Sequence, residues 1–116
     1  MTFEFIETIK SWGREVLLEC NDKYAFKEIT LKKGKRTSLQ YHKRKKESGY
    51  VVSGLLELEY QIGKEMLKRK LEHGGCYTIS PKMKHRMRAL VDSVYVEAST
   101  PELDDVVRIE DDYGRA

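Results

Sequence analysis

Turn-forming residues interrupt this chain at short, regular intervals, and this spacing restricts the fold more than any other feature. Apolar and polar residues alternate between the turns, most clearly in the segment LELEYQI at residues 56–62. Alternation with a period of two is typical of a half-buried β-strand. About ten such short strands, with no internal repeat and no linker, predict one closed or sandwiched antiparallel sheet domain. We therefore expect a single all-β domain over residues 1–116.

The expected strands lie at residues 3–9, 15–20, 24–31, 37–42, 47–53, 56–62, 66–71, 76–79, 84–90 and 94–99. The parity of the apolar residues along these strands predicts a core that contains Ile29, Leu31, Leu56, Leu58, Val94 and Val96. The pattern changes after Pro101, where the apolar residues at 103, 106, 107 and 109 predict a short helix or an extended tail over the sheet.

Residues 34–54 contain three side chains able to bind a metal, namely Gln40, His42 and Glu47. Gln40 and His42 are two residues apart, so both point to the same face of a strand. Glu47 follows after four residues, a length that suits a turn into an antiparallel neighbour. With His85 as a fourth ligand, the set suits Zn²⁺, Fe²⁺, Mn²⁺, Co²⁺ or Ni²⁺. The alternative is that these are ordinary polar strand residues beside a solvated glutamate.

The spacing of this stretch resembles the first sequence motif of the cupin family. It reads Gly34, five residues, Gln40, one residue, His42, four residues, Glu47, six residues and Gly54, with glutamine where many cupins have histidine. A second segment is similar to the second cupin motif, Gly…Pro-x-Gly-x-x-His. It contains Gly74, Ser80, Lys82 and His85, with Ser80 in the proline position and Lys82 in the glycine position.

The sequence resembles even more closely the cupin domain of type II mannose-6-phosphate isomerases, which is often fused to a guanylyltransferase. The similar segments are WG at 12–13, SLQYH at 38–42, VVSG at 51–54, HRM at 85–87 and RIEDDYGR at 108–115. The resemblance implies a small cupin jelly roll, an antiparallel β-barrel. It also implies a divalent metal, zinc first, held by Gln40, His42, Glu47 and His85. The activity that it implies is aldose–ketose isomerisation between mannose 6-phosphate and fructose 6-phosphate.

Four residues depart from the isomerase pattern. Lys45 replaces an arginine, Ser48-Gly49 replaces His-Trp, and Lys82 replaces the motif glycine. These departures favour an alternative function, a non-catalytic cupin that binds a sugar or nucleotide sugar beside a nucleotidyltransferase or a polysaccharide biosynthesis enzyme. An iron dioxygenase is a third possibility, although such sites usually present three histidines.

Lys27 and Glu97 are the candidates for proton transfer. Lys27 shares the apolar face of its strand with Ile29 and Leu31, and a buried lysine needs a charged partner. It can hold a phosphate, carry a proton, or extend its ammonium group to the rim. Parity places Glu97 opposite the neighbouring valines, which favours an outward carboxylate. If that face instead lines the cavity, Glu97 is the natural base.

Basic residues near the expected site are candidates for holding an anionic sugar phosphate. The candidates for this role are Lys45, Arg86, Arg108, Tyr113 and Arg115. Parity turns Arg86 away from the face of His85. The arginines of the tail can equally form salt bridges with Asp104 and Asp105. Trp12 is expected to pack under a loop, with stacking on a sugar as the alternative.

Composition excludes several classes of protein. The net charge is only +3 with 35% charged residues, and the basic runs lie in turns without a stripe of aromatic residues, so nucleic acid is not an expected partner. No apolar run approaches the roughly 18 residues of a membrane span. Cys20 and Cys76 have no metal-type spacing, and the first residues lack a signal pattern, so we expect reduced thiols in the cytoplasm. Phe3, Phe5 and Ile6 form an apolar edge, which predicts a homodimer.

Overall fold

The computed structural model describes residues 5–116, which form strands and no helix. The strands are β1 (Ile6–Lys10), β2 (Gly13–Cys20), β3 (Ala25–Leu31), β4 (Leu39–Tyr41), β5 (Glu47–Ser53), β6 (Leu55–Ile62), β7 (Glu65–Glu72), β8 (Cys76–Ile79), β9 (His85–Ala89), β10 (Ser93–Ser99) and β11 (Val107–Glu110). The strands predicted from alternation are confirmed to within a few residues at their ends. The expected first residues of β1, including Phe3, lie outside the described part of the chain.

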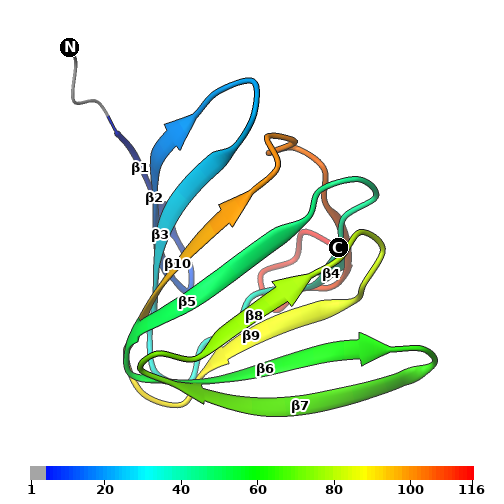
Figure 1. Ribbon diagram of the computed structural model, residues 1–116. Coiled ribbons are helices and arrows are strands. Elements are labelled where there is room, and N and C mark those ends of the chain that lie inside the picture. Colours follow the sequence, from blue (N-terminus) through cyan, green and yellow to red (C-terminus); the bar gives the residue numbers. More distant parts are fainter. Residues whose placement is uncertain (1–4) are drawn as a thin grey trace.

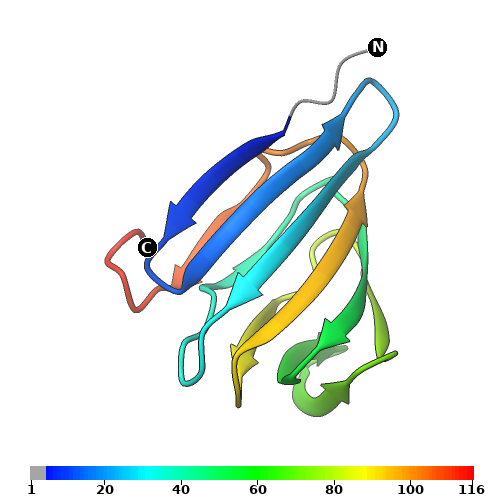
Figure 2. The same cartoon turned by 90° about the vertical axis from the view of Figure 1, so that its left-hand side faces the viewer.

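The strands form two antiparallel sheets that face each other (Figures 1 and 2). One sheet has the order β1-β2-β3-β10-β5-β8, and the other has the order β11-β4-β9-β6-β7. This is the jelly-roll architecture of a cupin. Within residues 5–116 the two ladders do not join, so the expected barrel is an open sandwich. The C-terminal tail adopts the extended alternative, because β11 pairs with β4 instead of forming a helix.

The apolar core lies between the sheets. It contains the predicted Ile29, Leu31, Leu56 and Leu58. Val94 and Val96 were predicted wrongly, because β10 turns Tyr95 and Glu97 inward and leaves both valines half-buried on the outer face. The error arises because the outer face of this central strand is itself apolar. Sequence parity alone therefore fits either orientation of β10.

The turn between β1 and β2 depends on a glycine. Gly13 has φ of 150°, and a Cβ atom at this position would collide with the carbonyl oxygen of Thr30 on β3. The close approach of the two backbones seats the preceding Trp12 in the core, where it is 6% exposed. Trp12 is thus packed in the core, and it also lines the large cavity described below, so its stacking on a sugar stays a prediction.

Strand β1 lies at the edge of its sheet and leaves apolar side chains uncovered, since Ile6 and Ile9 are 64% and 73% exposed. The homodimer expected from this edge stays a prediction. Within the described residues, no helix could span a membrane.

Candidate metal centre and acid–base site

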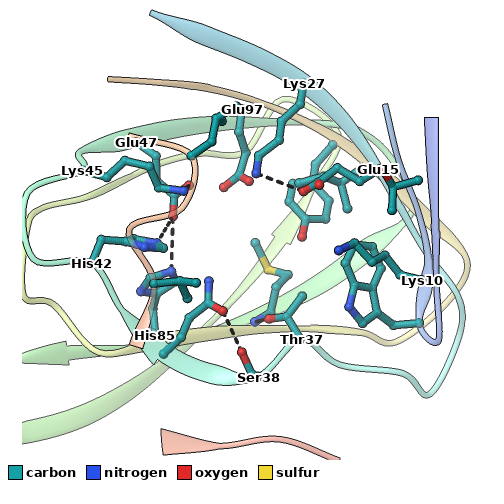
Figure 3. Close-up of a pocket in the computed structure, with 18 of the residues that line it drawn as sticks. Lys10, Glu15, Lys27, Thr37, Ser38, His42, Lys45, Glu47, His85 and Glu97 are labelled. Atoms are coloured by element: carbon teal, nitrogen blue, oxygen red, sulfur yellow. Dashed lines mark hydrogen bonds and ion pairs between the residues drawn. The ribbon is translucent and has the colours of Figure 1, made fainter. Parts of the chain in front are cut away.

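Three buried side chains meet at one end of the sandwich. His42 follows β4, Glu47 begins β5 and His85 begins β9. Glu47 Oε1 lies 3.1 Å from His42 Nε2 and 3.2 Å from His85 Nε2 (Figure 3). The potential ligand atoms of the three residues all lie within 4.8 Å of one another. The structure thus brings together three of the four predicted metal ligands from separate parts of the chain.

The other ring nitrogen of each histidine faces a backbone carbonyl. His42 Nδ1 lies 2.6 Å from the carbonyl oxygen of Asp105, and His85 Nδ1 lies 2.9 Å from that of Met83. A carbonyl oxygen only accepts, so each Nδ1 carries a proton and each Nε2 is directed at the centre of the cluster. Two imidazole nitrogens and a carboxylate oxygen, oriented in this way, fit a divalent transition metal.

Gln40 lies beside this cluster. It pairs with His85 across the β4–β9 ladder and lines the same cavity. Its Oε1 accepts a hydrogen bond of 2.6 Å from the hydroxyl of Ser38, which engages the atom that would coordinate a metal. The role of Gln40 as a fourth ligand stays a prediction.

The charge on Glu47 is stabilised by its neighbours. Burial opposes ionisation of this carboxyl, but its contacts with the rings of His42 and His85 outweigh burial. The ammonium of buried Lys45, 3.8 Å from Glu47 Oε2, acts in the same direction. Together they hold the pKa of Glu47 well below its usual range. Lys45 thus lies beside the predicted metal site. Its ammonium group there pairs with the carboxylate of Glu47.

Glu97 also faces the cavity, as the alternative orientation of β10 required. Burial and the nearby charge of Glu47 raise the pKa of Glu97 to about 7. The hydroxyl of Tyr77 donates a 2.8 Å hydrogen bond to Glu97 Oε2. Two carboxyls in one cavity therefore have opposite shifts in pKa, which suits one as a ligand and the other as a proton carrier.

Gly49 creates the space for the hydrogen bond between Tyr77 and Glu97. On the sheet it pairs with Glu97 of β10 on one side and with Tyr77 of β8 on the other. A Cβ atom at position 49 would overlap the ring and hydroxyl of Tyr77. The glycine that departs from the isomerase motif therefore has a structural partner, the tyrosine that lies across it.

Lys27 projects into the cavity as its parity predicted, and it is held between two acids (Figure 3). Its ammonium lies 2.9 Å from Glu15 Oε1. Burial lowers the pKa of Lys27, but attraction to Glu97 and Glu15 outweighs burial and raises it. The lysine stays charged and balances part of the negative charge beside Glu97.

The cluster opens into a cavity of about 550 Å³ between the two sheets. The predicted site residues that line it are Lys27, Gln40, His42, Lys45, Glu47, His85, Glu97, Arg108 and Arg115. Residues that the sequence did not indicate include Lys10, Glu15 and Tyr77. The period of two along β1 could have indicated Lys10, because Ile6, Thr8 and Lys10 lie on the same face of the strand. All three side chains line the cavity.

Arg86 and Tyr113 are not among the residues that line the cavity. Arg86 is buried on the opposite side of β9, where its guanidinium donates to the carbonyl of Thr37 and to Glu110. The hydroxyl of Tyr113 donates to the carbonyl of Arg36. Both side chains bind the C-terminal segment to the rest of the fold. Neither side chain lines the cavity, and a role of these two residues in substrate binding stays a prediction.

The two arginines of the tail differ in their partners. Arg115 pairs with Asp111 at 2.7 Å, and not with Asp104 or Asp105 as one reading of the sequence expected. Arg108 has a buried Nε without a hydrogen-bond partner in the described residues. An unpartnered guanidinium nitrogen in the cavity wall is available to an anionic ligand.

Comparison with known proteins identifies the family of the chain. Residues 3–111 match the family model described as mannose-6-phosphate isomerase C-terminal. The chain belongs to this family. The xanthan biosynthesis protein XanB of Xanthomonas campestris pv. campestris is 31% identical over 110 residues, which cover 91% of this chain and 23% of XanB. The mannose-1-phosphate guanylyltransferase ManC of Salmonella typhimurium is 29% identical over 113 residues, which cover 94% of this chain and 23% of ManC. This member of the mannose-6-phosphate isomerase C-terminal family thus spans less than a quarter of either relative.

Solved structures share the same cupin fold. KdgF from Halomonas sp. superposes with a TM-score of 0.75 at 22% identity, over 87% of this chain and 90% of KdgF. The Bacillus subtilis oxalate decarboxylase OxdC, in a deletion mutant, superposes with a TM-score of 0.82 at 14% identity, over 91% of this chain and 30% of OxdC. At these identities the likeness extends to the fold alone.

Proposed function

We propose that this cupin is a metal-dependent sugar-phosphate isomerase of the mannose-6-phosphate/fructose-6-phosphate type. The observation that carries the proposal is the position of Glu97. Its carboxyl shares one cavity with the His42–Glu47–His85 cluster, and its pKa of about 7 suits both the uptake and the release of a proton. The family to which the chain belongs supports the same substrate class.

Isomerisation of an aldose to a ketose moves a proton between two adjacent carbons. Glu97 would take the proton from C2 of the aldose and return it to C1, passing through an ene-diol. The oxygen on C1 gains a proton as the ene-diol forms, and the C2 hydroxyl loses its proton as the ketone forms, so that one proton passes in net from O2 to O1. A divalent metal, when bound by His42, Glu47 and His85, supplies a Lewis acid that polarises the substrate oxygens. Lys27 and Tyr77 hold the Glu97 carboxylate in place through charge and a hydrogen bond.

The phosphate would bind at the opposite end of the cavity. Lys10 lies on the far side of the cavity from His42 in Figure 3. Within residues 5–116, Lys10 and Arg108 are not neutralised by an ion pair, in contrast to Lys27, Lys45 and Arg115. Of these two free cations, Lys10 lies away from the metal ligands, whereas Arg108 lies opposite Gln40 on the β11–β4 ladder. A cation on the far side of the cavity suits a substrate with reacting carbons at one end and a phosphate at the other.

The similarity to ManC, a mannose-1-phosphate guanylyltransferase, supports a second candidate, a cupin that binds a sugar phosphate without turnover beside a nucleotidyltransferase. Because this chain matches only 23% of ManC, the activity of that whole protein does not transfer to it. For either candidate we propose a cytoplasmic homodimer. The free thiols of Cys20 and Cys76 support the cytoplasm, and the exposed edge of β1 supports the dimer. Light scattering at micromolar concentration tests the dimer, and a monomeric mass would refute it.

The isomerase is tested by a coupled assay that converts mannose 6-phosphate to fructose 6-phosphate with added Zn²⁺ or Co²⁺. Glu97→Gln keeps the size and the hydrogen-bond acceptor of the side chain, and should lower kcat by roughly 10²–10⁴-fold while metal binding persists. Calorimetric binding of the sugar phosphate without turnover would favour the second candidate. Absence of turnover with every hexose and pentose phosphate would rule out the isomerase.

A further inference from the structure

The loop that carries His42 is hydrogen-bonded along its whole length to a distant segment of the chain. This loop, residues 42–46, joins β4 to β5, and the segment, residues 100–105, leads from β10 towards β11. At one end the amide of Lys46 donates to the hydroxyl of Thr100 at 3.1 Å. In return the amide of Thr100 donates to the carbonyl of Lys46 at 3.0 Å.

Asp105 makes the remaining contacts of the loop. Its carboxylate accepts the backbone N–H groups of Lys43, Arg44 and Lys45, at 3.0, 2.7 and 2.9 Å. Its backbone carbonyl oxygen lies 2.6 Å from His42 Nδ1. One residue therefore binds four consecutive residues of the loop, including the ring of a metal ligand. Three converging N–H groups match the acceptor capacity of a carboxylate and exceed that of a neutral side chain.

The contacts of Asp105 control the direction of two groups at the metal cluster. The hydrogen bond to Nδ1 fixes both the proton and the rotation of the His42 ring, so that Nε2 faces Glu47 at 3.1 Å. The bond to the amide of Lys45 fixes the backbone from which the ammonium reaches Glu47 at 3.8 Å. Both groups would move if the loop moved away from Asp105.

The same segment also closes part of the cavity. Leu103, Asp104 and Val106, the neighbours of Asp105 in the chain, line the cavity. The position of Asp105 therefore determines where this part of the cavity wall lies relative to His42. A displacement of the segment would change the ligand loop and the substrate space together.

We propose that Asp105 is a positioning residue of the metal centre, which orients His42 and the loop of residues 42–46 although it is not itself a ligand. This inference rests on the metal site of the proposed function, and its own content is the dependence of the His42 ring on Asp105. Residues that hold a metal-ligating histidine from behind commonly contribute 10–100-fold to metal affinity. We expect a contribution in this range from Asp105.

The test compares Asp105→Asn with Asp112→Asn in the full chain. Asp112 is a matched control, because its carboxylate also connects the C-terminal segment to the body, through a 2.7 Å pair with Arg36, but makes no contact with residues 42–46. Co²⁺ affinity is measured by competition with a chelator. In the metal-free proteins, the ¹⁵N shifts of the His42 ring and the amide exchange rates of residues 43–46 are measured by NMR.

We expect Asp105→Asn to weaken Co²⁺ binding by roughly 10-fold or more, to move the ring shifts of His42 and to speed amide exchange at residues 43–46. Asp112→Asn should match the wild type in all three. If Asp105→Asn fails to fold, Thr100→Val is measured instead, and it should speed exchange at Lys46 and weaken Co²⁺ binding by a smaller factor.

A folded Asp105→Asn protein with Co²⁺ affinity within twofold of the wild type and an unchanged His42 ring would overturn the inference. If Thr100→Val is measured in place of Asp105→Asn, an unchanged Co²⁺ affinity together with an unchanged His42 ring would also overturn the inference. If the wild type binds no metal, the metal centre of the proposed function fails. The ring shifts and exchange rates of the metal-free proteins then decide the inference by themselves.

Discussion

The two histidine-bearing loops of the cluster present the same group in the same way, but they are held by different parts of the chain. In each loop a backbone carbonyl faces Nδ1 and directs Nε2 at Glu47. For His85 this carbonyl belongs to Met83, two residues earlier in the same loop. For His42 it belongs to Asp105, 63 residues away. One metal ligand is thus oriented by local sequence and the other by tertiary structure.

The two loops also touch each other. The amide of Lys82, in the loop before His85, donates to the carbonyl oxygen of His42 at 2.6 Å. Lys82 adopts φ of 69°, a left-handed conformation in which a side chain with a Cβ is disfavoured. The locally held loop therefore has backbone strain, whereas the loop of residues 42–46 depends on remote hydrogen bonds. The difference predicts that changes in the two loops have separable effects.

The largest effect is expected from removing the histidines themselves. His42→Ala and His85→Ala should each weaken metal binding by more than the roughly 10–100-fold that residues behind a ligand contribute. Only His42→Ala should also speed amide exchange near Asp105, because only His42 bonds to it. Metal titration and NMR exchange check both statements.

His73→Ala is the matched control, because His73 is the third histidine and lies exposed outside the cluster. The metal affinity of the His73→Ala variant should equal that of the wild type. Full metal occupancy in His42→Ala or His85→Ala would show that the cluster is not a metal site. Equal loosening of residues 100–105 in both variants would remove the contrast between the loops.

A second prediction concerns Gly49, on the strand that follows the first loop, and Tyr77, on the strand that precedes the second. Gly49→Ala should lower the free energy of unfolding by about 1–3 kcal/mol, because its Cβ would overlap the Tyr77 ring. Tyr77→Phe should cost less, since it removes only the hydrogen bond to Glu97. Urea unfolding measures both. A neutral Gly49→Ala would mean that Tyr77 does not depend on the space at position 49.

The third prediction is a pH dependence that sets Glu97 against Glu47. The pKa of Glu97 is raised from its usual value near 4.5 to about 7, so the folded state binds this proton more tightly than the unfolded state. Stability of the metal-free protein should therefore fall by up to about 3 kcal/mol between about pH 4.5 and pH 7. Glu97→Gln should remove this decline.

Urea titrations at pH 5 and pH 8 in the presence of a chelator measure the effect of Glu97. Glu47 contributes with the opposite sign at lower pH, because its pKa is held well below the usual range and its stabilisation is lost only on further acidification. An identical decline in wild type and Glu97→Gln would show that another group causes it.

The smallest effect is expected at Lys82. Lys82→Gly removes the Cβ from a left-handed residue and should stabilise the fold by about 0.5 kcal/mol, after the greater flexibility of glycine in the unfolded chain is counted. Lys82→Ala keeps the Cβ and serves as the control without this gain. Thermal unfolding distinguishes them. A loss of stability in Lys82→Gly would mean that the lysine side chain stabilises this turn.

Local sequence determined much of this protein. Alternation and turn residues fixed the strands, because a strand with one buried face needs a period of two. The spacing of His42 and Glu47, together with His85, predicted the cluster that the fold assembles. The inward direction of Lys27 followed from the same parity.

Tertiary structure decided the features for which parity or spacing allowed two answers. The inward face of β10 was one, because both faces of this strand contain apolar residues and only packing selects Glu97 over the valines. The partners of the tail were another, since Arg86 and Tyr113 are occupied by backbone carbonyls that no sequence pattern announces. The orientation of His42 depends on Asp105 for the same reason. A hydrogen bond across 63 residues exists only after the sheets have brought its two ends together.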